Sequence, residues 1–204
     1  MKKLILASSS SRRKNLLKQI CAEFEVIESN IDENPDYMDN EYSPYEWVKA
    51  VSKKKGHSVI DKVPKDSIII SADTIVTDLG RILHRPANKA EGIKMLKKLQ
   101  GRKHTVYTGL NIIFLDKDKN IEHEENIVDA TDVYMNILSD EEIEAYMDTN
   151  EPYDKAGGYA IQEKGALLIE SIYGDYYTVV GLPISILYKR LKANGVNLLE
   201  FWKK

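Results

Sequence analysis

The hydrophobic and polar positions along the chain change their spacing several times, and each change predicts a new element. Short apolar runs are typical of buried strands, whereas apolar residues at every third or fourth position indicate one face of a helix. The apolar runs predict strands at 3–7, 24–28, 67–76, 104–116 and 121–137, with two short strands closing the glycine-punctuated segment 155–183. The helical spacing predicts helices at 12–21, 44–60, 88–99, 139–147 and 182–193.

Polar residues stand where three of these helices should begin. Ser43 followed by Pro44 has the pattern of an N-cap with proline at the first helical position. Ser139 and Glu142 have the spacing of a capping box, and Asn88 is a suitable cap for the helix that follows it. These three helix starts therefore rest on two signals each, the cap and the apolar spacing.

Strands and helices follow one another without strict alternation. This order favours an α/β fold in which helices flank a mixed, twisted sheet. The turn-rich segments 30–44 and 78–81 predict an acidic loop and a hairpin turn. No linker, low-complexity tract or repeat interrupts the chain, so we expect residues 1–204 to form a single domain, built as two closely associated lobes.

The composition is that of an ordinary globular chain. Of its 204 residues, 43% are hydrophobic and 30% are charged, and the net charge of -3 provides no global positive field for nucleic acid. The single cysteine, Cys21, excludes a disulfide framework and a cysteine-based zinc site within the chain. No stretch approaches the ~20 apolar residues of a membrane span, and the apolar run at 4–7 is too short for a signal peptide. We therefore expect a cytoplasmic enzyme without a membrane or nucleic acid partner.

The segment 8–13 places two arginines in the first turn of a predicted helix. A helix start carries partial positive charge, so each arginine there costs roughly 0.3–1 kcal/mol. Ser10 or Ser11 can cap the helix. One interpretation is a phosphate cradle, in which backbone N–H groups and the side chains of Arg12 and Arg13 bind an anion. The alternative is a solvated basic helix end, and no P-loop motif occurs in the chain.

Asp73 is a carboxylate at the end of an apolar strand, in the stretch "SADT". A buried carboxylate is unfavourable unless it is paired or bound to a cation. Asp73 could therefore ligate Mg²⁺ or activate a water molecule. The alternative is that it caps the turn that follows.

A third polar cluster is "EPYDKAGGYAIQ", at 151–162. Asp154 and Lys155 precede two glycines, which allow a ligand to approach the backbone closely. Gln162 can read the edge of a base, because its amide offers both a donor and an acceptor. The alternative is an ordinary loop with a surface ion pair, which contributes little.

Taken in order, these segments resemble the Maf family of nucleoside triphosphate pyrophosphatases. The matching pieces are "LILASSSSRRKNLL", "SADTIV", "RPAN", "GRKHTVYTGL", "ATDVYMNILSDEEIEAYM", "EPYDKAGGYAIQ" and "YYTVVGLP". Together they extend over nearly the whole chain. The resemblance implies an α/β body related to the inosine triphosphatase fold, with a cleft between two lobes, and it implies a homodimer.

The resemblance also implies a reaction. A nucleoside triphosphate is hydrolysed to the monophosphate and pyrophosphate with the help of a divalent metal cation, for which Mg²⁺, Mn²⁺ and Co²⁺ are all suitable. Arg12, Thr74 and Gln162 match the pattern of members that prefer dTTP and UTP. Members that prefer 7-methyl-GTP carry tryptophan near the position of Arg12 and "SDQ" in place of "ADT", and neither occurs here.

Residue by residue, the resemblance implies how the triphosphate is held and attacked. Ser8, Arg12 and Arg13 hold the phosphates. Glu33 and Asp73 lie near the metal and the attacking water, and Asp73 accepts the proton of that water. Pyrophosphate then leaves.

Four further residues receive roles from the same resemblance. Lys54, the middle one of three adjacent lysines, matches the family's helix lysine and contacts phosphate, although the register leaves its neighbours open. Arg85 stands where the family usually has a lysine before proline, and it keeps the positive charge. Asp154 and Lys155 belong to the "DKAG" stretch at the cleft.

Two other classes of protein remain open at this point. One is a non-catalytic regulator that binds a pyrimidine nucleotide with the same arginines and does not need Asp73 as a base. The other is a nucleic-acid-binding protein that uses the basic helix end. The net charge of -3 and the lack of stacking aromatic residues near Arg12 argue against the second class.

Overall fold

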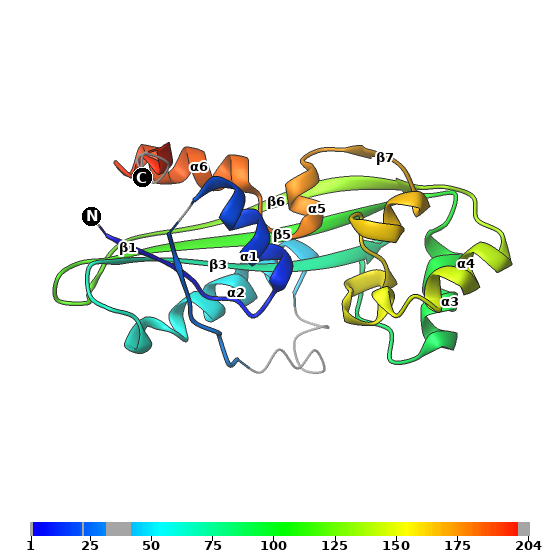
Figure 1. The fold of residues 1–204 in the computed structure, drawn as a ribbon, viewed down its shortest axis with the longest axis horizontal. Coiled ribbons are helices and arrows are strands. Elements are labelled where there is room, and N and C mark those ends of the chain that lie inside the picture. The colour runs from blue at the N-terminus through cyan, green and yellow to red at the C-terminus, as the bar shows by residue number, and fades with distance from the viewer. Residues whose placement is uncertain (1, 22, 32–41, 200–204) are drawn as a thin grey trace. The chain divides into compact units, whose positions relative to one another are not determined.

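The computed structural model describes residues 2–21, 23–31 and 42–199, and this part of the chain forms a seven-stranded sheet with flanking helices (Figure 1). The strand order is β2-β1-β3-β5-β6-β7, and β4 pairs with β3. The strands are β1 (Lys3–Leu6), β2 (Glu25–Val26), β3 (Ser67–Asp78), β4 (Arg81–Leu83), β5 (Lys103–Leu115), β6 (Ile121–Met135) and β7 (Ile169–Tyr173). β1 is parallel to β2 and β3, whereas the pairs β3–β4 and β6–β7 are antiparallel. The predicted α/β class with a mixed sheet is confirmed.

The chain divides into two compact units. Unit 1 comprises Met1–Asp73, Thr108–Asp129 and Gly181–Lys204, and unit 2 comprises Thr74–Tyr107 and Ala130–Val180. The three long strands β3, β5 and β6 each contribute residues to both units. That the units act as one domain remains a prediction. Among the described residues, no helix has the length and apolar character to cross a membrane.

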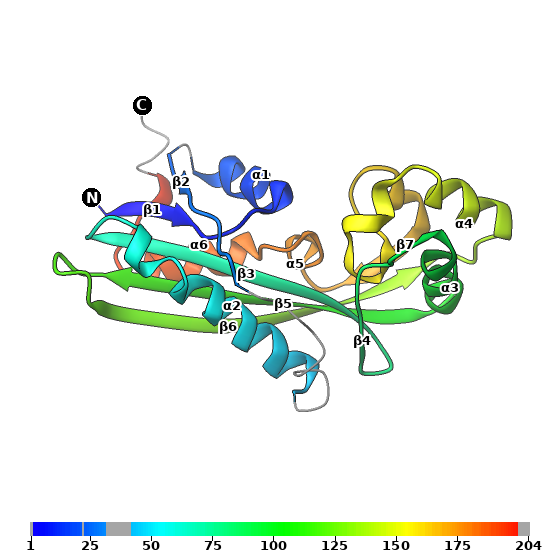
Figure 2. The ribbon, with the colours of Figure 1, turned by 90° about the horizontal axis from the view of Figure 1, so that it is seen from below.

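Unit 1 packs its helices on strands that are buried along most of their length. Its helices are α1 (Ser11–Ile20), α2 (Pro44–His57), the 3₁₀ turn η2 (Ile60–Lys62) and α6 (Ile184–Ala193). α1 contacts α6, and Figure 2 shows α2 alongside the strands. One apolar cluster joins η2 and its flanks to the sheet through Ile5, Ala7, Val59, Val63, Ile69, Ile113 and Leu115. The predicted cap of α2 is confirmed, because Ser43 is the N-cap directly before Pro44 and forms a capping box with Glu46.

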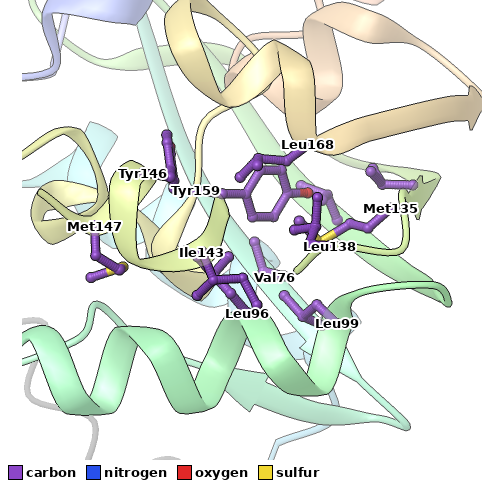
Figure 3. Packing of buried hydrophobic residues seen from close by; sticks show 12 residues of the cluster. Val76, Leu96, Leu99, Met135, Leu138, Ile143, Tyr146, Met147, Tyr159 and Leu168 are labelled. Atoms are coloured by element: carbon purple, nitrogen blue, oxygen red, sulfur yellow. The ribbon is translucent and has the colours of Figure 1, made fainter. Parts of the chain in front are cut away.

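Unit 2 has its own hydrophobic core, which Figure 3 shows from close by. Its helices and turns are α3 (Lys89–Leu99), α4 (Asp140–Met147), η3 (Glu151–Asp154), η4 (Ala156–Gly158), η5 (Glu163–Leu168) and α5 (Tyr176–Val180). α3 and α4 pack against each other, and both contribute buried apolar side chains to this core. Asn88 caps α3, and Ser139 with Glu142 forms the capping box of α4, as predicted.

The prediction of two short strands at the end of segment 155–183 was half wrong. β7 is one of them, but the stretch "YYTVV" forms α5. Asp175 causes the difference: its side chain accepts a hydrogen bond from the backbone N–H of Tyr177 (2.9 Å), and its carbonyl accepts one from Thr178 (3.1 Å). This local capping outweighs the strand preference of the β-branched and aromatic side chains.

Candidate functional site

Asp73 lies inside β3 and not at the end of a strand as predicted, because residues 74–78 continue the strand, so it caps no turn there. Its carboxylate is paired. The Nζ of Lys55, on α2, donates a hydrogen bond to Asp73 Oδ1 over 2.7 Å. Asp73 is only 7% exposed and Lys55 only 6% exposed, so neither charge is well hydrated. The sequence predicted that a buried carboxylate at this position needs a partner, and that partner is the ammonium group of Lys55 on α2.

The structure brings Lys55, and not the predicted Lys54, beside Asp73. Lys54 is exposed, and Lys53 forms an ion pair with Glu124 (3.3 Å). The missed signal is helical spacing, because the buried positions Val48, Val51, Ser52 and Lys55 recur at intervals of three, one and three residues. The phosphate contact assigned to Lys54 remains a prediction.

Two glycines allow α2 to approach the sheet closely enough for this pair. A Cβ atom on Gly109 of β5 would lie 2.2 Å from the carbonyl oxygen of Val48. A Cβ atom on Gly56 of α2 would lie 2.8 Å from the hydroxyl oxygen of Ser71 on β3. The same hydroxyl donates a hydrogen bond to the Ser52 carbonyl over 2.8 Å. The two glycines therefore permit a close contact between α2 and the strands, and at this separation the Lys55 side chain reaches Asp73.

Glu124 on β6 fastens the last turn of α2. Its Oε1 atom lies 2.8 Å from His57 Nε2 and accepts a hydrogen bond from Asn111 Nδ2 over 2.9 Å. Partial burial opposes ionisation of Glu124, but the hydrogen bonds from Asn111 and His57 outweigh it and lower the pKa of this carboxyl. Glu124 therefore provides an anionic anchor one turn from Lys55.

The basic start of α1 also belongs to unit 1. Ser10 is the N-cap, one of the two predicted candidates, and its side chain accepts from the backbone N–H of Arg13. Ser8 is buried, and its hydroxyl accepts from the Ser10 N–H over 3.2 Å. Arg13 Nε donates to the Gly181 carbonyl over 2.8 Å, which orients its guanidinium group. Arg12 is half-buried, and the first turn holds no acidic residue.

Unit 2 brings two predicted segments together. The N–H of Gly157 donates to the His84 carbonyl over 3.1 Å, so the turn before Arg85 lies against the segment that carries Lys155. Gly157 has a φ of 72°, and a Cβ atom there would lie 2.9 Å from Val76. Glycine is therefore needed at this position on two grounds.

The polar side chains of this segment differ in exposure. Asp154 and Arg85 are exposed, whereas Thr74 and Gln162 are half-buried. Lys155 is ion-paired with Asp154, and its Nζ also donates to the Glu151 carbonyl over 3.3 Å. The predicted surface ion pair is present, and it lies in a segment held by other hydrogen bonds.

A buried histidine and tyrosine join this segment to β5, which sequence reasoning missed. His104 Nε2 lies 2.6 Å from the hydroxyl oxygen of Tyr159, and the two rings meet edge to face at 5.3 Å. Burial lowers the pKa of His104 to about 4, so the imidazole is neutral at pH 7. The only sequence signal for this contact was the position of Tyr159 directly after Gly157 and Gly158.

The residues present suit a metal that takes most of its ligands from a substrate. The part of the chain that the structure describes holds no group of three or more His, Cys, Asp or Glu side chains that could bind a metal ion. Asp73, whose Oδ1 accepts a hydrogen bond from Lys55, is one carboxylate that could contribute, and the predicted second ligand, Glu33, lies outside the described residues. Mg²⁺ is commonly bound by one or two carboxylates together with substrate phosphates and water. Asp73 and Glu33 together would fit this binding mode, and the metal site stays a prediction.

Comparison with known sequences identifies the class. The family described as Maf-like protein matches residues 3–194, and this chain belongs to that family. A relative from Thermoanaerobacter sp. (strain X514), named dTTP/UTP pyrophosphatase, is 46% identical over 93% of this chain and 95% of its own length. Proteins of the same name from Caldicellulosiruptor bescii and Bacillus anthracis (strain CDC 684) are 45% and 44% identical, over 98% and 97% of this chain and 98% of each of those proteins.

A solved structure also aligns with the chain. It is the Ham1 protein of Staphylococcus aureus, which is 15% identical and aligns over 95% of this chain and 100% of that one, with a TM-score of 0.49.

Proposed function

We propose that this protein is a nucleoside triphosphate pyrophosphatase that hydrolyses dTTP and UTP. Water and the triphosphate yield the nucleoside monophosphate and pyrophosphate. The observation that carries the proposal is the buried Lys55–Asp73 pair, in a chain that matches proteins named dTTP/UTP pyrophosphatase over nearly its whole length. When water attacks an α-phosphate, a carboxylate can accept the proton of the water, and a nearby ammonium group can stabilise the negative charge that develops on the phosphate.

In this mechanism Asp73 is the proton acceptor. Its carboxylate takes a proton from the water that attacks the α-phosphorus, and the bond from that phosphorus to the bridging oxygen breaks. The hydrogen bond from Lys55 orients the carboxylate and keeps a positive charge beside the reacting phosphate. Positioning and electrostatic stabilisation supply most of the catalysis in phosphoryl chemistry of this kind.

The phosphates are held by cationic and hydrogen-bonding groups. Ser8, Arg12 and Arg13 at the start of α1 bind them, and Lys54 and Arg85 supply further positive charge. The orientation of Arg13 by the Gly181 carbonyl supports its part in this, because a guanidinium group held in place loses less conformational freedom on binding. Hydrogen bonds to charged groups contribute roughly 1.5–3 kcal/mol each, which exceeds the cost of arginine at a helix start.

The base and sugar are contacted by the residues of unit 2. Thr74 and Gln162 select the pyrimidine together with Arg12, and Asp154 and Lys155 line the nucleotide. The half-buried positions of Thr74 and Gln162 support this role, because a partly desolvated amide discriminates better between donors and acceptors than an exposed one.

Asp73 and Glu33 would hold the divalent cation. When bound, Mg²⁺, Mn²⁺ or Co²⁺ would neutralise phosphate charge and polarise the phosphorus–oxygen bonds. We further propose that the protein acts in the cytoplasm as a homodimer. The absence of a membrane-spanning helix from the described residues is compatible with this location.

The test is pyrophosphate release from dTTP, UTP, CTP, dATP, GTP and 7-methyl-GTP with Mg²⁺ or Mn²⁺. We expect turnover of dTTP and UTP, and its loss in Asp73→Asn. Asp61→Asn, an exposed aspartate outside the site, serves as the matched control and should retain full activity. Tight nucleotide binding without pyrophosphate from any triphosphate would instead identify a non-catalytic regulator.

A further inference from the structure

One acidic side chain in unit 2 bridges the two ends of segment 151–165. The Oε1 atom of Glu151 accepts hydrogen bonds from the Tyr146 hydroxyl (3.0 Å) and from the N–H of Gly165 (3.1 Å). Its Oε2 atom accepts from the N–H of Lys164 (3.2 Å). Because Glu151 opens the segment and Lys164 and Gly165 close it, this carboxylate draws the segment into a loop. The loop carries Lys155 and Gln162.

Tyr146 of α4 reinforces the closure from inside. Its hydroxyl oxygen accepts a hydrogen bond from the N–H of Ala160 over 3.1 Å while donating to Glu151. The ring is 5% exposed and belongs to the apolar core that also holds Tyr159 (Figure 3). Burial raises the pKa of Tyr146, so its hydroxyl keeps the proton that it donates.

The backbone confirms that the closure is tight. A Cβ atom on Gly165 would lie 2.0 Å from the Ala160 carbonyl oxygen and 2.8 Å from the Tyr146 hydroxyl. Asn150, just before Glu151, and Glu163, just before Lys164, have φ values of 62° and 57°. Asparagine adopts this left-handed conformation readily, but glutamate does so rarely, and at Glu163 it persists because surrounding contacts enforce it.

We propose that Glu151 and Tyr146 form a clasp that holds the 151–165 loop in the conformation that receives the pyrimidine nucleotide. Both are positioning residues, and the inference rests on the proposed function, in which Lys155 and Gln162 contact the substrate. A loop that is already ordered pays less conformational entropy when the ligand binds. The clasp therefore governs substrate affinity and pyrimidine selection, whereas proton transfer at Asp73 does not depend on it.

The first experiment is steady-state kinetics of Glu151→Gln, Tyr146→Phe and the double variant. We expect KM for dTTP to rise about tenfold, kcat to change less than twofold, and the preference for dTTP over CTP to shrink. The double variant should be no worse than the more impaired single variant, because both changes open the same clasp. Glu144→Gln is the control, because Glu144 is an exposed glutamate on α4, the helix that carries Tyr146, and this variant should match the wild type.

The second experiment is hydrogen exchange in the nucleotide-free protein, which does not depend on activity. The amides of Ala160, Lys164 and Gly165 should exchange at least tenfold faster in Glu151→Gln, while those of α3 keep their rates. Glu151 is half-buried and glutamine preserves its shape, so this variant is expected to fold even if Tyr146→Phe does not.

The outcomes separate the two proposals. Unchanged exchange at those three amides, or a lower melting temperature with KM unchanged, would overturn the clasp. A wild-type protein that releases no pyrophosphate would overturn the proposed function, and the exchange rates would then decide the clasp by themselves.

Discussion

At the scale of single residues, the Lys55–Asp73 pair makes the stability of unit 1 depend on one of three adjacent lysines. Removing one partner of a buried ion pair leaves an uncompensated charge and costs about 3–5 kcal/mol. We therefore expect Lys55→Met to lower the free energy of unfolding by about this amount, and Lys54→Met, at an exposed position, to change it by less than about 0.5 kcal/mol. Urea unfolding of both variants measures the difference.

A double variant tests the cause of that loss. Lys55→Met combined with Asp73→Asn removes both charges, so it should recover much of the stability that Lys55→Met loses. Equal losses of stability for Lys54→Met and Lys55→Met would mean that the Asp73 carboxylate does not depend on the ammonium group of Lys55.

His104 gives a second prediction at this scale, for the dependence of stability on pH. Its pKa in the folded protein is about 4, against 6.5 for the exposed imidazole. Between these values the unfolded chain binds a proton that the folded chain does not, so stability rises with pH. The contribution is complete above pH 6.5 and is lost as the pH falls to 4, by on the order of 3 kcal/mol.

The measurement is the urea midpoint at several pH values between 7 and 4.5. His104→Gln retains a hydrogen-bonding group for Tyr159 but does not titrate, so its midpoint should fall less steeply with pH than that of the wild type. Parallel pH profiles would show that His104 is not the group responsible.

These residues also mark how far sequence reasoning reaches. The pattern predicted that Asp73 is buried and needs a partner, because an apolar run surrounds it. Lys55 was missed because the choice among three consecutive lysines followed the resemblance to the family, whereas the helical spacing from Val48 and Val51 indicates Lys55. The contacts of His104 with Tyr159 join residues 55 positions apart, and no local pattern carries that information.

At the scale of elements, the helices with both a cap and an apolar face were predicted within a few residues. α2, α3 and α4 begin where their caps predict, and β5 and β6 form the long strands expected. The strand predicted at 24–28 is confirmed as the two-residue β2, and the miss is α5, which forms where Asp175 caps a stretch of strand-forming side chains. The contacts that cap α5 are local, and they outweigh the strand preference of its side chains.

The docking of α2 provides the prediction for this scale. Gly109→Ala places a methyl group 2.2 Å from a backbone oxygen of α2, which cannot move aside, so we expect a loss of about 1–3 kcal/mol or more. The displaced helix would also carry Lys55 away from Asp73, and pyrophosphate release should fall with it.

Gly92→Ala in α3 is the matched control. Its methyl group would clash with the flexible end of the Met147 side chain, which can move, and would lie 3.5 Å from Pro86 Cβ, an ordinary contact. Alanine gains up to about 1 kcal/mol over glycine inside a helix. Thermal unfolding and turnover of both variants distinguish the cases. A Gly109→Ala protein as stable and active as Gly92→Ala would show that close helix docking is not required.

At the scale of the whole molecule, the candidate residues are divided between the units. Ser8, Arg12, Arg13 and Asp73 belong to unit 1, whereas Arg85, Lys155 and Gln162 belong to unit 2. A ligand that binds the folded chain stabilises it by mass action, by about 2.7 kcal/mol at one hundred times its Kd. For a chain of this size, that corresponds to a rise in melting temperature of roughly 5–10 °C.

We therefore expect dTTP with Mg²⁺ to raise the melting temperature, and thymidine with Mg²⁺ to raise it far less, because the cationic groups act on the phosphates. Arg12→Ala in unit 1 and Lys155→Ala in unit 2 should each reduce the shift if residues of both units act on one nucleotide. A shift that only Arg12→Ala reduces would confine phosphate binding to unit 1. An unchanged melting temperature at saturating dTTP and Mg²⁺ would contradict nucleotide binding itself, since a ligand that binds the folded state and not the unfolded chain must shift the unfolding equilibrium.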